Sequence, residues 1–191
     1  MNRLALALAA MFAAPAFAGS ITLDFETAPS FAPVGNTYAA YGLSFGQDLQ
    51  GLANDALGPY FSNAPSPLGV MFVSGADASI NASSGFYGLS LYYSSADVVT
   101  DGVQVWSGLD GTGALLASLS LQNNASQGCT DTAYCNWNFL NAGWTGAGRS
   151  ITFAAGTQLA AFDNISVVPE PSSVLLAGLA LTALVASRRR G

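Results

Sequence analysis

Short segments in which apolar and polar residues alternate run through most of this chain, and they constrain its fold more than any other feature. Residues 20–26 (SITLDFE) place Ile21, Leu23 and Phe25 on one side and polar residues on the other. Successive side chains of a β-strand point to opposite faces, so this period of two is typical of a half-buried strand. The same alternation recurs in residues 85–94, 102–108, 115–122, 149–156 and 158–168.

These segments predict an all-β domain. Shorter strand candidates are residues 42–46, 69–75 and 136–141, and Gly-rich turns such as GLDGTG (residues 108–113) separate most of the segments. Residues 19–168 contain no convincing amphipathic helix pattern. About eight to ten short strands with such turns favour an antiparallel β-sandwich of the jelly-roll kind. Residues 47–67 read as one long loop, of the type that often forms a binding rim.

The N-terminal residues 1–18 (MNRLALALAAMFAAPAFA) have the three parts of a secretory signal peptide. Arg3 supplies the positive charge, an apolar run follows, and Ala16-Phe17-Ala18 forms a small-x-small cleavage site. We therefore expect a signal peptidase to cleave after Ala18. The exported body would then begin at Gly19.

The charged side chains between residues 19 and 168 exclude several classes of function. This stretch holds ten Asp or Glu residues and one basic residue, Arg149, and the whole chain has no Lys and no His. Such an acidic surface repels phosphate backbones, so no nucleic-acid partner is expected. Without His, Ser-His-Asp and Cys-His catalysis are excluded. We expect no enzyme activity, and a carboxylate-based glycoside hydrolase is the remaining catalytic alternative.

Cys129 and Cys135 are the two cysteines of the chain. Export places them in an oxidising compartment, which favours a disulfide between them. Two thiols without a histidine cannot complete a zinc site, so metal binding is the weaker alternative. The disulfide would close a short loop and act as a local staple.

Three acids suggest a structural Ca²⁺ site, the one cofactor that we consider for this chain. Asp24 and Glu26 follow the first strand candidate, and Asp163 lies in the last one, on the same face as the apolar Ile165 by strand parity. First and last strands of sandwiches often lie side by side. A carboxylate that faces inward needs a metal ion or backbone N–H groups as partner, and Ca²⁺ prefers oxygen ligands. The alternative is a set of solvated acids at strand ends.

Aromatic side chains suggest a second kind of site. Trp137 and Trp144 flank a polar segment beside the cysteine loop, where flat rings could bind the faces of neutral sugars. The more common fate of tryptophan is a place in the core.

The C-terminal residues 169–191 (PEPSSVLLAGLALTALVASRRRG) combine three features in order. Pro169, Glu170 and Pro171 come first, an apolar segment over residues 172–187 follows as a short membrane helix, and Arg188, Arg189 and Arg190 end it. The arginines resist translocation and would stay in the cytoplasm, opposite the exported body. This tail resembles the sorting signal of PEP-CTERM proteins. The resemblance implies recognition of the Pro-Glu-Pro triplet by an exosortase-type membrane protease in a Gram-negative bacterium, and a link to exopolysaccharide and biofilm.

The sequence therefore predicts three parts: a signal peptide (1–18), a β-sandwich ectodomain (19–168) and a sorting tail (169–191). We expect a non-enzymatic surface or matrix protein that is anchored transiently in the inner membrane before it reaches the outer surface or the medium. A carbohydrate-binding module with a structural Ca²⁺ is the first alternative, and a secreted hydrolase is the second. A plain C-terminal membrane anchor is the alternative interpretation of the tail.

Overall fold

The body of the protein is an antiparallel β-structure. The computed structural model describes residues 19–153 and 158–169, and Ser20–Pro169 form one compact unit. Its elements in chain order are β1 (Ile21–Leu23), the 3-10 helix η2 (Ala39–Tyr41), β2 (Leu43–Phe45), β3 (Leu49–Leu52), β4 (Val70–Val73), β5 (Ser79–Ser95), β6 (Val99–Trp106), β7 (Leu115–Leu121), β8 (Asn138–Thr152) and β9 (Ala160–Pro169).

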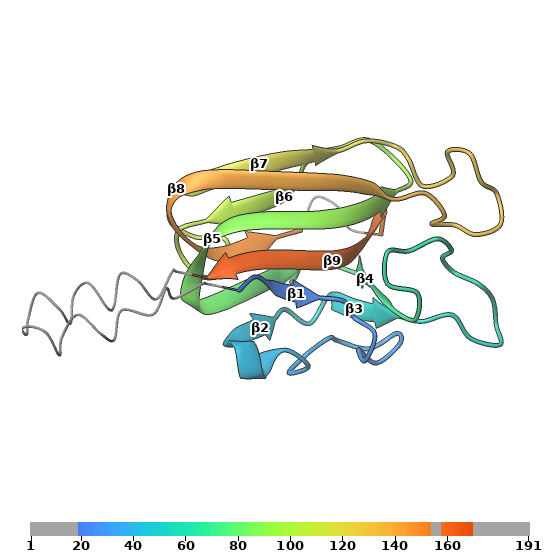
Figure 1. Ribbon diagram of the computed structural model, residues 1–191, viewed down its shortest axis with the longest axis horizontal. Coiled ribbons are helices and arrows are strands. Elements are labelled where there is room, and N and C mark those ends of the chain that lie inside the picture. The colour runs from blue at the N-terminus through green and yellow to red at the C-terminus, as the bar shows by residue number, and fades with distance from the viewer. Residues whose placement is uncertain (1–18, 154–157, 170–191) are drawn as a thin grey trace, which may run out of the picture. The chain divides into compact units, whose positions relative to one another are not determined.

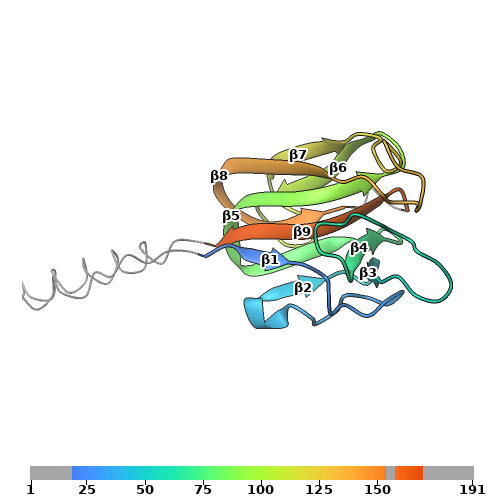
Figure 2. The ribbon, with the colours of Figure 1, turned by 45° about the vertical axis from the view of Figure 1, so that its right-hand side comes forward.

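Two long strands, β5 and β8, connect the two layers of the body (Figures 1 and 2). The first part of β5 pairs with β2 and with the end of β8, which continues the layer into β6 and β7. The second part of β5 pairs with β9 and with the start of β8, and β9 continues the other layer into β1, β4 and β3. The register of β5 shifts around Gly85, whose φ of 76° favours glycine. The sheet thus folds over at this bulge.

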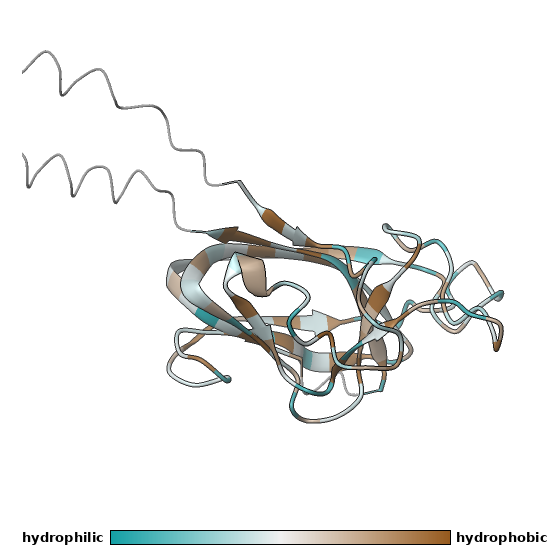
Figure 3. Cartoon of the chain, turned by 90° about the horizontal axis from the view of Figure 1, so that it is seen from below, coloured by the Kyte–Doolittle hydropathy of each residue, from teal (hydrophilic) through white to brown (hydrophobic). Residues whose placement is uncertain are grey.

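The main core lies between these layers. Its side chains are almost fully buried. One layer contributes Leu91, Phe162 and Ile165, and the other contributes Ile80, Val103, Val105, Ile151 and Phe153. The rings of Phe153 and Phe162 meet edge to face with their centroids 4.8 Å apart. Each such side chain stabilises the fold by about 1.5–3 kcal/mol on burial. Apolar and paler segments accordingly alternate along the strands in Figure 3.

The structure confirms the all-β antiparallel fold and corrects two details of the expected strands. Of the candidates at residues 136–141 and 149–156, residues 138–141 and 149–152 belong to one strand, β8, because Ala142, Gly143 and Gly148 between them continue the pairing with β5. The expected loop at residues 47–67 contains the strand β3, which pairs with β4. The pairing of the first strand with the last is confirmed, since Ile21 lies opposite Val167.

Several predictions fall outside the described residues. They are the signal peptide (1–18), Glu170 and Pro171, the apolar segment 172–187 and the arginines 188–190. Within the described part of the chain, no helix has the length and apolar character that crossing a membrane requires. The proposed domain boundaries at residues 18 and 168 stay predictions.

Candidate functional site

Two long loops meet at one end of the body (right side of Figure 1). They are the β3–β4 loop (residues 53–69) and the β7–β8 loop (residues 122–137). Their backbones pair as in a short parallel bridge between Phe61 and Tyr134. The Tyr134 amide donates to the Tyr60 carbonyl over 3.3 Å, and the Ser62 amide donates to the Tyr134 carbonyl over 3.0 Å. The loops therefore hold each other in place.

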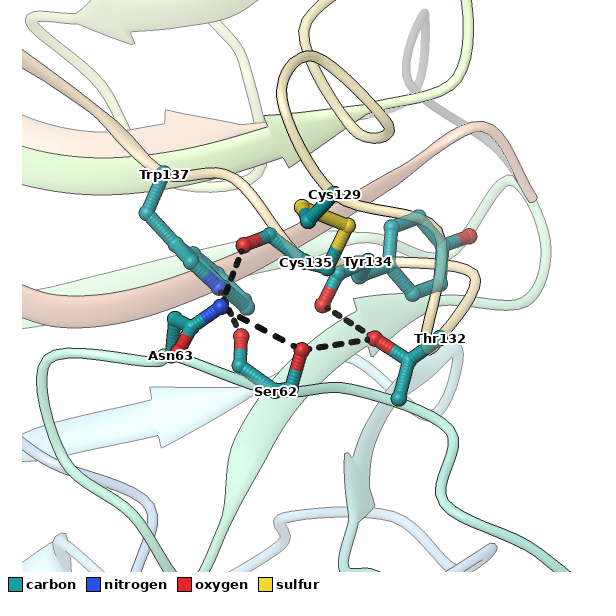
Figure 4. Close-up of a disulfide and its surroundings, with 7 residues drawn as sticks. All are labelled: Ser62, Asn63, Cys129, Thr132, Tyr134, Cys135 and Trp137. Carbon is teal, nitrogen blue, oxygen red and sulfur yellow. Dashed lines mark hydrogen bonds between the residues drawn. A yellow bond between two sulfur atoms is a disulfide. The ribbon is translucent and has the colours of Figure 1, made fainter.

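Side chains reinforce this junction, as Figure 4 shows. The Trp137 indole N–H donates to the Ser62 carbonyl over 2.9 Å, and the side-chain Nδ2 of Asn63 donates to the Cys135 carbonyl over 3.1 Å. The hydroxyls of Ser62 and Thr132 lie 3.1 Å apart. Because these bonds cross between segments about seventy residues apart in sequence, they fix the loops without regular secondary structure.

The disulfide between Cys129 and Cys135 is confirmed, with the two Cα atoms 6.0 Å apart. The Cys135 amide also donates to the Ala125 carbonyl over 2.8 Å, which ties the disulfide to the start of the same loop. Asp131 lies near both sulfurs. Because disulfide-bonded sulfurs are not thiolate ligands, the cluster of Cys129, Asp131 and Cys135 is no metal site. The disulfide is thus a staple of the loop junction.

A small second core lies beneath the junction. Leu52, Phe61, Val70 and Ala161 are its buried members. Tyr60, Phe72, Tyr134 and Trp137 pack against it from outside and remain partly exposed. The β3–β4 loop therefore covers the outer face of β4 and β9, and the four aromatic side chains lie around the small second core.

Asp163 anchors the β3–β4 loop from below. Its carboxylate accepts hydrogen bonds from the Ser66 amide over 2.7 Å, the Ser66 hydroxyl over 2.5 Å and the Asn164 amide over 2.6 Å. The side chain is fully buried, and this burial raises the pKa of Asp163 to about 6 against the lowering effect of these bonds. Asp163 is thus a structural anchor of the loop.

The face on which Asp163 lies corrects the parity argument. Phe162 and Ile165 both belong to the main core although they are three residues apart. Asn164 between them has a φ of 46°, and the register with β5 shifts at this point. This bulge breaks the alternation, so Asp163 lies on the side of Ala161, beneath the loop, and not on the side of Ile165.

Asp24 and Glu26 lie beside the same loop. Glu26 accepts bonds from the amides of Leu68, over 2.8 Å, and Gly69, over 3.3 Å. Asp24 accepts a bond from the Tyr38 hydroxyl over 3.1 Å, and the pKa of Tyr38 is raised, first by burial. The three predicted Ca²⁺ ligands are therefore neighbours of one loop, each with protein donors.

These donors bear on the calcium hypothesis. The buried carboxylate of Asp163, which suggested a metal ion, already accepts hydrogen bonds from the Ser66 and Asn164 N–H groups, and such N–H groups were the alternative to a metal ion. No observation on the described residues calls for a cation there. The calcium site stays a prediction.

The two predicted sugar-binding tryptophans have different surroundings. Trp137 lines a hollow of about 400 Å³ together with Tyr92, Asn63, Gln127 and Asn136. Trp144 packs edge to face on Phe86 with ring centroids 5.4 Å apart, and it is not among the lining residues of this hollow. Its indole nitrogen is buried without a hydrogen-bond partner. Of the two, Trp137 has the surroundings of a ligand site.

A second hollow on the same loops was missed from the sequence. It measures about 280 Å³ and is lined by Phe31, Leu52, Tyr60, Phe72, Ser74, Ala133, Tyr134 and Gln158. We call it the aromatic groove. Its residues come from separate parts of the chain, so no spacing links them. The one local signal was the exposed Phe31, which stands among polar and small residues in APSFAP.

Several solved structures resemble the body of the chain at low sequence identity. CsCBM6-3 from Clostridium stercorarium in complex with cellobiose is 14% identical, with a TM-score of 0.43 over 78% of this chain and 94% of that one. The K2 cleaved adhesin domain of Lys-gingipain is 12% identical, with a TM-score of 0.49 over 78% and 99%. A family 43 arabinoxylan arabinofuranohydrolase from Bacillus subtilis is 17% identical, with a TM-score of 0.42 over 66% and 26%. Similarities at this level say nothing of a ligand.

The C-terminus gives the more particular result. Residues 167–190 match the PEP-CTERM protein-sorting motif. Such a motif implies processing by an exosortase, a membrane protein, and therefore export with transient anchoring in a membrane. Pro169, the first residue of the Pro-Glu-Pro triplet, is the last residue of β9. No curated protein matches the chain.

Proposed function

We propose that this chain is a non-enzymatic surface or matrix protein of an exopolysaccharide-producing Gram-negative bacterium. The sorting motif at residues 167–190 carries the proposal. In this proposal a signal peptidase removes residues 1–18, and residues 169–191 hold the body at the inner membrane until an exosortase cleaves near the triplet. The body then reaches the outer surface or the medium, where biofilm polysaccharide surrounds it.

The absence of enzyme activity is part of the proposal. No His or Lys occurs in the sequence, so general-base catalysis by either residue type is excluded. Asp163, the acid whose pKa is raised, is fully buried beneath Ser66 and cannot contact a substrate. A secreted glycoside hydrolase would need two accessible carboxyl groups on either side of the scissile bond. Turnover of any exopolysaccharide by the purified protein would contradict this part.

Mass spectrometry of the C-terminus tests the sorting step. The chain from the culture medium of its host should end near Pro169–Pro171, and it should stay in the membrane fraction with intact arginines when the exosortase gene is deleted. Glu170→Ala should block processing, because the triplet is the recognition element. Ser172→Ala, two residues further on, is the matched control and should leave processing unchanged.

Two outcomes would contradict the proposal. An intact arginine cluster on the extracellular protein of the wild-type strain would mean that no cleavage occurs. Identical processing with and without the exosortase would mean that another protease acts. A plain membrane anchor would keep the arginine cluster intact and leave all of the protein in the membrane fraction, with none in the medium.

The carbohydrate-binding alternative rests on the hollow beside Trp137. This hollow combines two aromatic rings with side-chain amides of Asn63, Gln127 and Asn136, which suit sugar hydroxyls. Trp137→Phe keeps an aromatic ring but removes the bond to the Ser62 carbonyl, so loss of stability and loss of binding must be measured separately.

The calcium site is a separate part of this alternative. Ca²⁺ at Asp24, Glu26 and Asp163 would raise the thermal melting temperature of the wild type. A melting temperature that does not change on addition of Ca²⁺ or of a chelator would remove the calcium site from the proposal.

A further inference from the structure

The aromatic groove has walls that meet at steep angles. The ring of Phe31 lies 5.1 Å from that of Tyr60 at 84°, and 6.2 Å from that of Phe72 at 69°. Phe72 belongs to β4 and rests on the second core, and Tyr134 comes from the β7–β8 loop. Two aromatic faces at nearly a right angle form a corner rather than a closed cavity.

The groove is held rigidly although its residues come from loops. Tyr60 and Tyr134 lie in the backbone bridge between the two loops, and the Phe31 amide donates to the Gly51 carbonyl over 2.9 Å. The Gln158 amide donates to the Val73 carbonyl over 2.8 Å. The walls are therefore preorganised, which reduces the entropy lost when a ligand binds.

Two lining residues adopt a backbone conformation that side chains disfavour. Phe31 has a φ of 54° and Gln158 a φ of 57°, both in the left-handed region. For a bulky residue this conformation is unusual, and residues held in it cluster at functional sites. Phe31 also leaves 52% of its surface exposed, so its ring contributes little to the core.

The polar groups of the groove are neutral. The Ser74 hydroxyl donates to the Asp48 carbonyl and the Tyr60 hydroxyl to the Asp55 carboxylate, so both offer acceptor oxygens. Gln158 and the Tyr134 hydroxyl complete the polar groups, and none of the lining residues carries a charge. The acidic body, with Arg149 as its one base, repels anionic polymers. Aromatic faces carry partial negative charge and attract the weakly positive C–H groups of sugar rings. The groove is thus complementary in charge to an uncharged polyhydroxylated ring.

We propose that the aromatic groove binds a neutral polysaccharide, with a sugar ring stacked against Phe31, Tyr60 and Phe72 and its hydroxyls bonded to Ser74, Gln158 and Tyr134. This inference rests on the proposed function only for the source of the polysaccharide. An apolar peptide is the other occupant that aromatic walls would accept. The ring of neutral hydrogen-bonding groups and the volume of about 280 Å³ favour the sugar.

Affinity electrophoresis of the purified full chain, with detergent present throughout, tests the proposal. Gels contain hydroxyethyl cellulose as the neutral probe, alginate as the anionic probe or glycol chitosan as the cationic probe. We expect retardation by the neutral polymer and none by alginate. Phe31→Gly should weaken the retardation at least tenfold, measured as the polymer concentration that halves mobility.

Phe31→Gly separates binding from folding. Glycine adopts a φ of 54° without strain, and this relief offsets the lost ring contacts and the greater entropy of the unfolded chain, so the melting temperature should change little. Phe139→Ala is the matched control, since Phe139 is a phenylalanine with 51% exposure on β8 and is not a lining residue of the groove. It should leave retardation unchanged.

Each other outcome overturns the proposal. Equal retardation of wild type and Phe31→Gly would place any sugar site elsewhere, such as the Trp137 hollow. Retardation by glycol chitosan alone would make charge the cause, and mobility unchanged by all three polymers would exclude polysaccharide binding. Competition of the retardation by a Phe- and Leu-rich peptide, without competition by cellobiose, would favour the peptide. These results do not depend on sorting, so the inference and the proposed function can fail separately.

Discussion

The buried carboxyl of Asp163 makes the stability of this protein depend on pH in a way that one substitution can isolate. Burial raises the pKa of Asp163 from 3.8 to about 6. The folded protein therefore binds this proton more tightly than the unfolded chain does. The stabilisation is fully present below pH 3.8 and is lost as the pH rises through about 6.

The hydrogen bonds around Ser66 explain why the protonated form fits. The Ser66 hydroxyl lies 2.5 Å from an Asp163 oxygen and 2.8 Å from the Asp24 carbonyl, but it has one proton to donate. When Asp163 is ionised, the hydroxyl can serve one of these acceptors. When Asp163 is protonated, its carboxyl donates to Ser66, and the Ser66 hydroxyl is free to donate to Asp24.

Asp163→Asn removes the titrating group and keeps the size of the side chain. The change in pKa from 3.8 to about 6 corresponds to on the order of 3 kcal/mol, at about 1.4 kcal/mol for each pH unit. The wild type should therefore gain on the order of 3 kcal/mol over the variant as the pH falls from about 7 to below about 4. The variant also loses an acceptor for one backbone N–H, which lowers its stability by about 1–3 kcal/mol at every pH.

Urea unfolding followed by tryptophan fluorescence over this pH range measures the difference. Asp131→Asn is the control, because Asp131 is an exposed acid on the β7–β8 loop. Its difference from the wild type should stay nearly constant. The role of the buried carboxyl is refuted if the difference in free energy of unfolding between the wild type and Asp163→Asn does not change with pH. It is refuted as well if the wild type becomes less stable relative to the variant on acidification.

The remaining predictions concern the loop staple and the bend of β8. Replacing Cys129 and Cys135 by serine should lower the free energy of unfolding by about 2 kcal/mol, seen as a lower urea midpoint, and an unchanged midpoint would contradict the role as staple. Gly148→Ala should lower it by about 1–3 kcal/mol, because the new Cβ would lie 2.9 Å from Val105 and 3.0 Å from Trp144. Gly143→Ala on the same strand meets no atom within 4 Å and should be nearly neutral in the same assay; equal effects would contradict the packing argument.

The strands could be predicted from the sequence wherever alternation was regular. β7 and the last part of β9 keep their period of two and were placed well, whereas the first four residues of β9 are all buried. β8 was divided because its middle, around Gly146 and Gly148, carries small residues at the bend and gives no periodic pattern. The left-handed Asn164 reversed the face of Asp163, since a bulge leaves no mark in an apolar–polar count.

The candidate site was predicted in part for a similar reason. Cys129, Cys135 and Trp137 are near one another in sequence, so residue type alone drew attention to them. The aromatic groove depends on the backbone bridge of Phe61 with Tyr134, which joins two irregular loops. Such long-range loop contacts have no period and no motif. Only the folded chain brings Phe31, Phe72 and Tyr134 together.

The pairing of β1 with β9 has a consequence for the timing of folding. Among the strands that the structure describes, β9 is the pairing partner of β1, and Ile21 lies opposite Val167. A chain that crosses a membrane from its N-terminus exposes β1 first and β9 last, so the first strand must wait unpaired for nearly the whole body. Contacts so distant in sequence form slowly. The body can therefore complete its fold only when the sorting motif itself is arriving at the membrane.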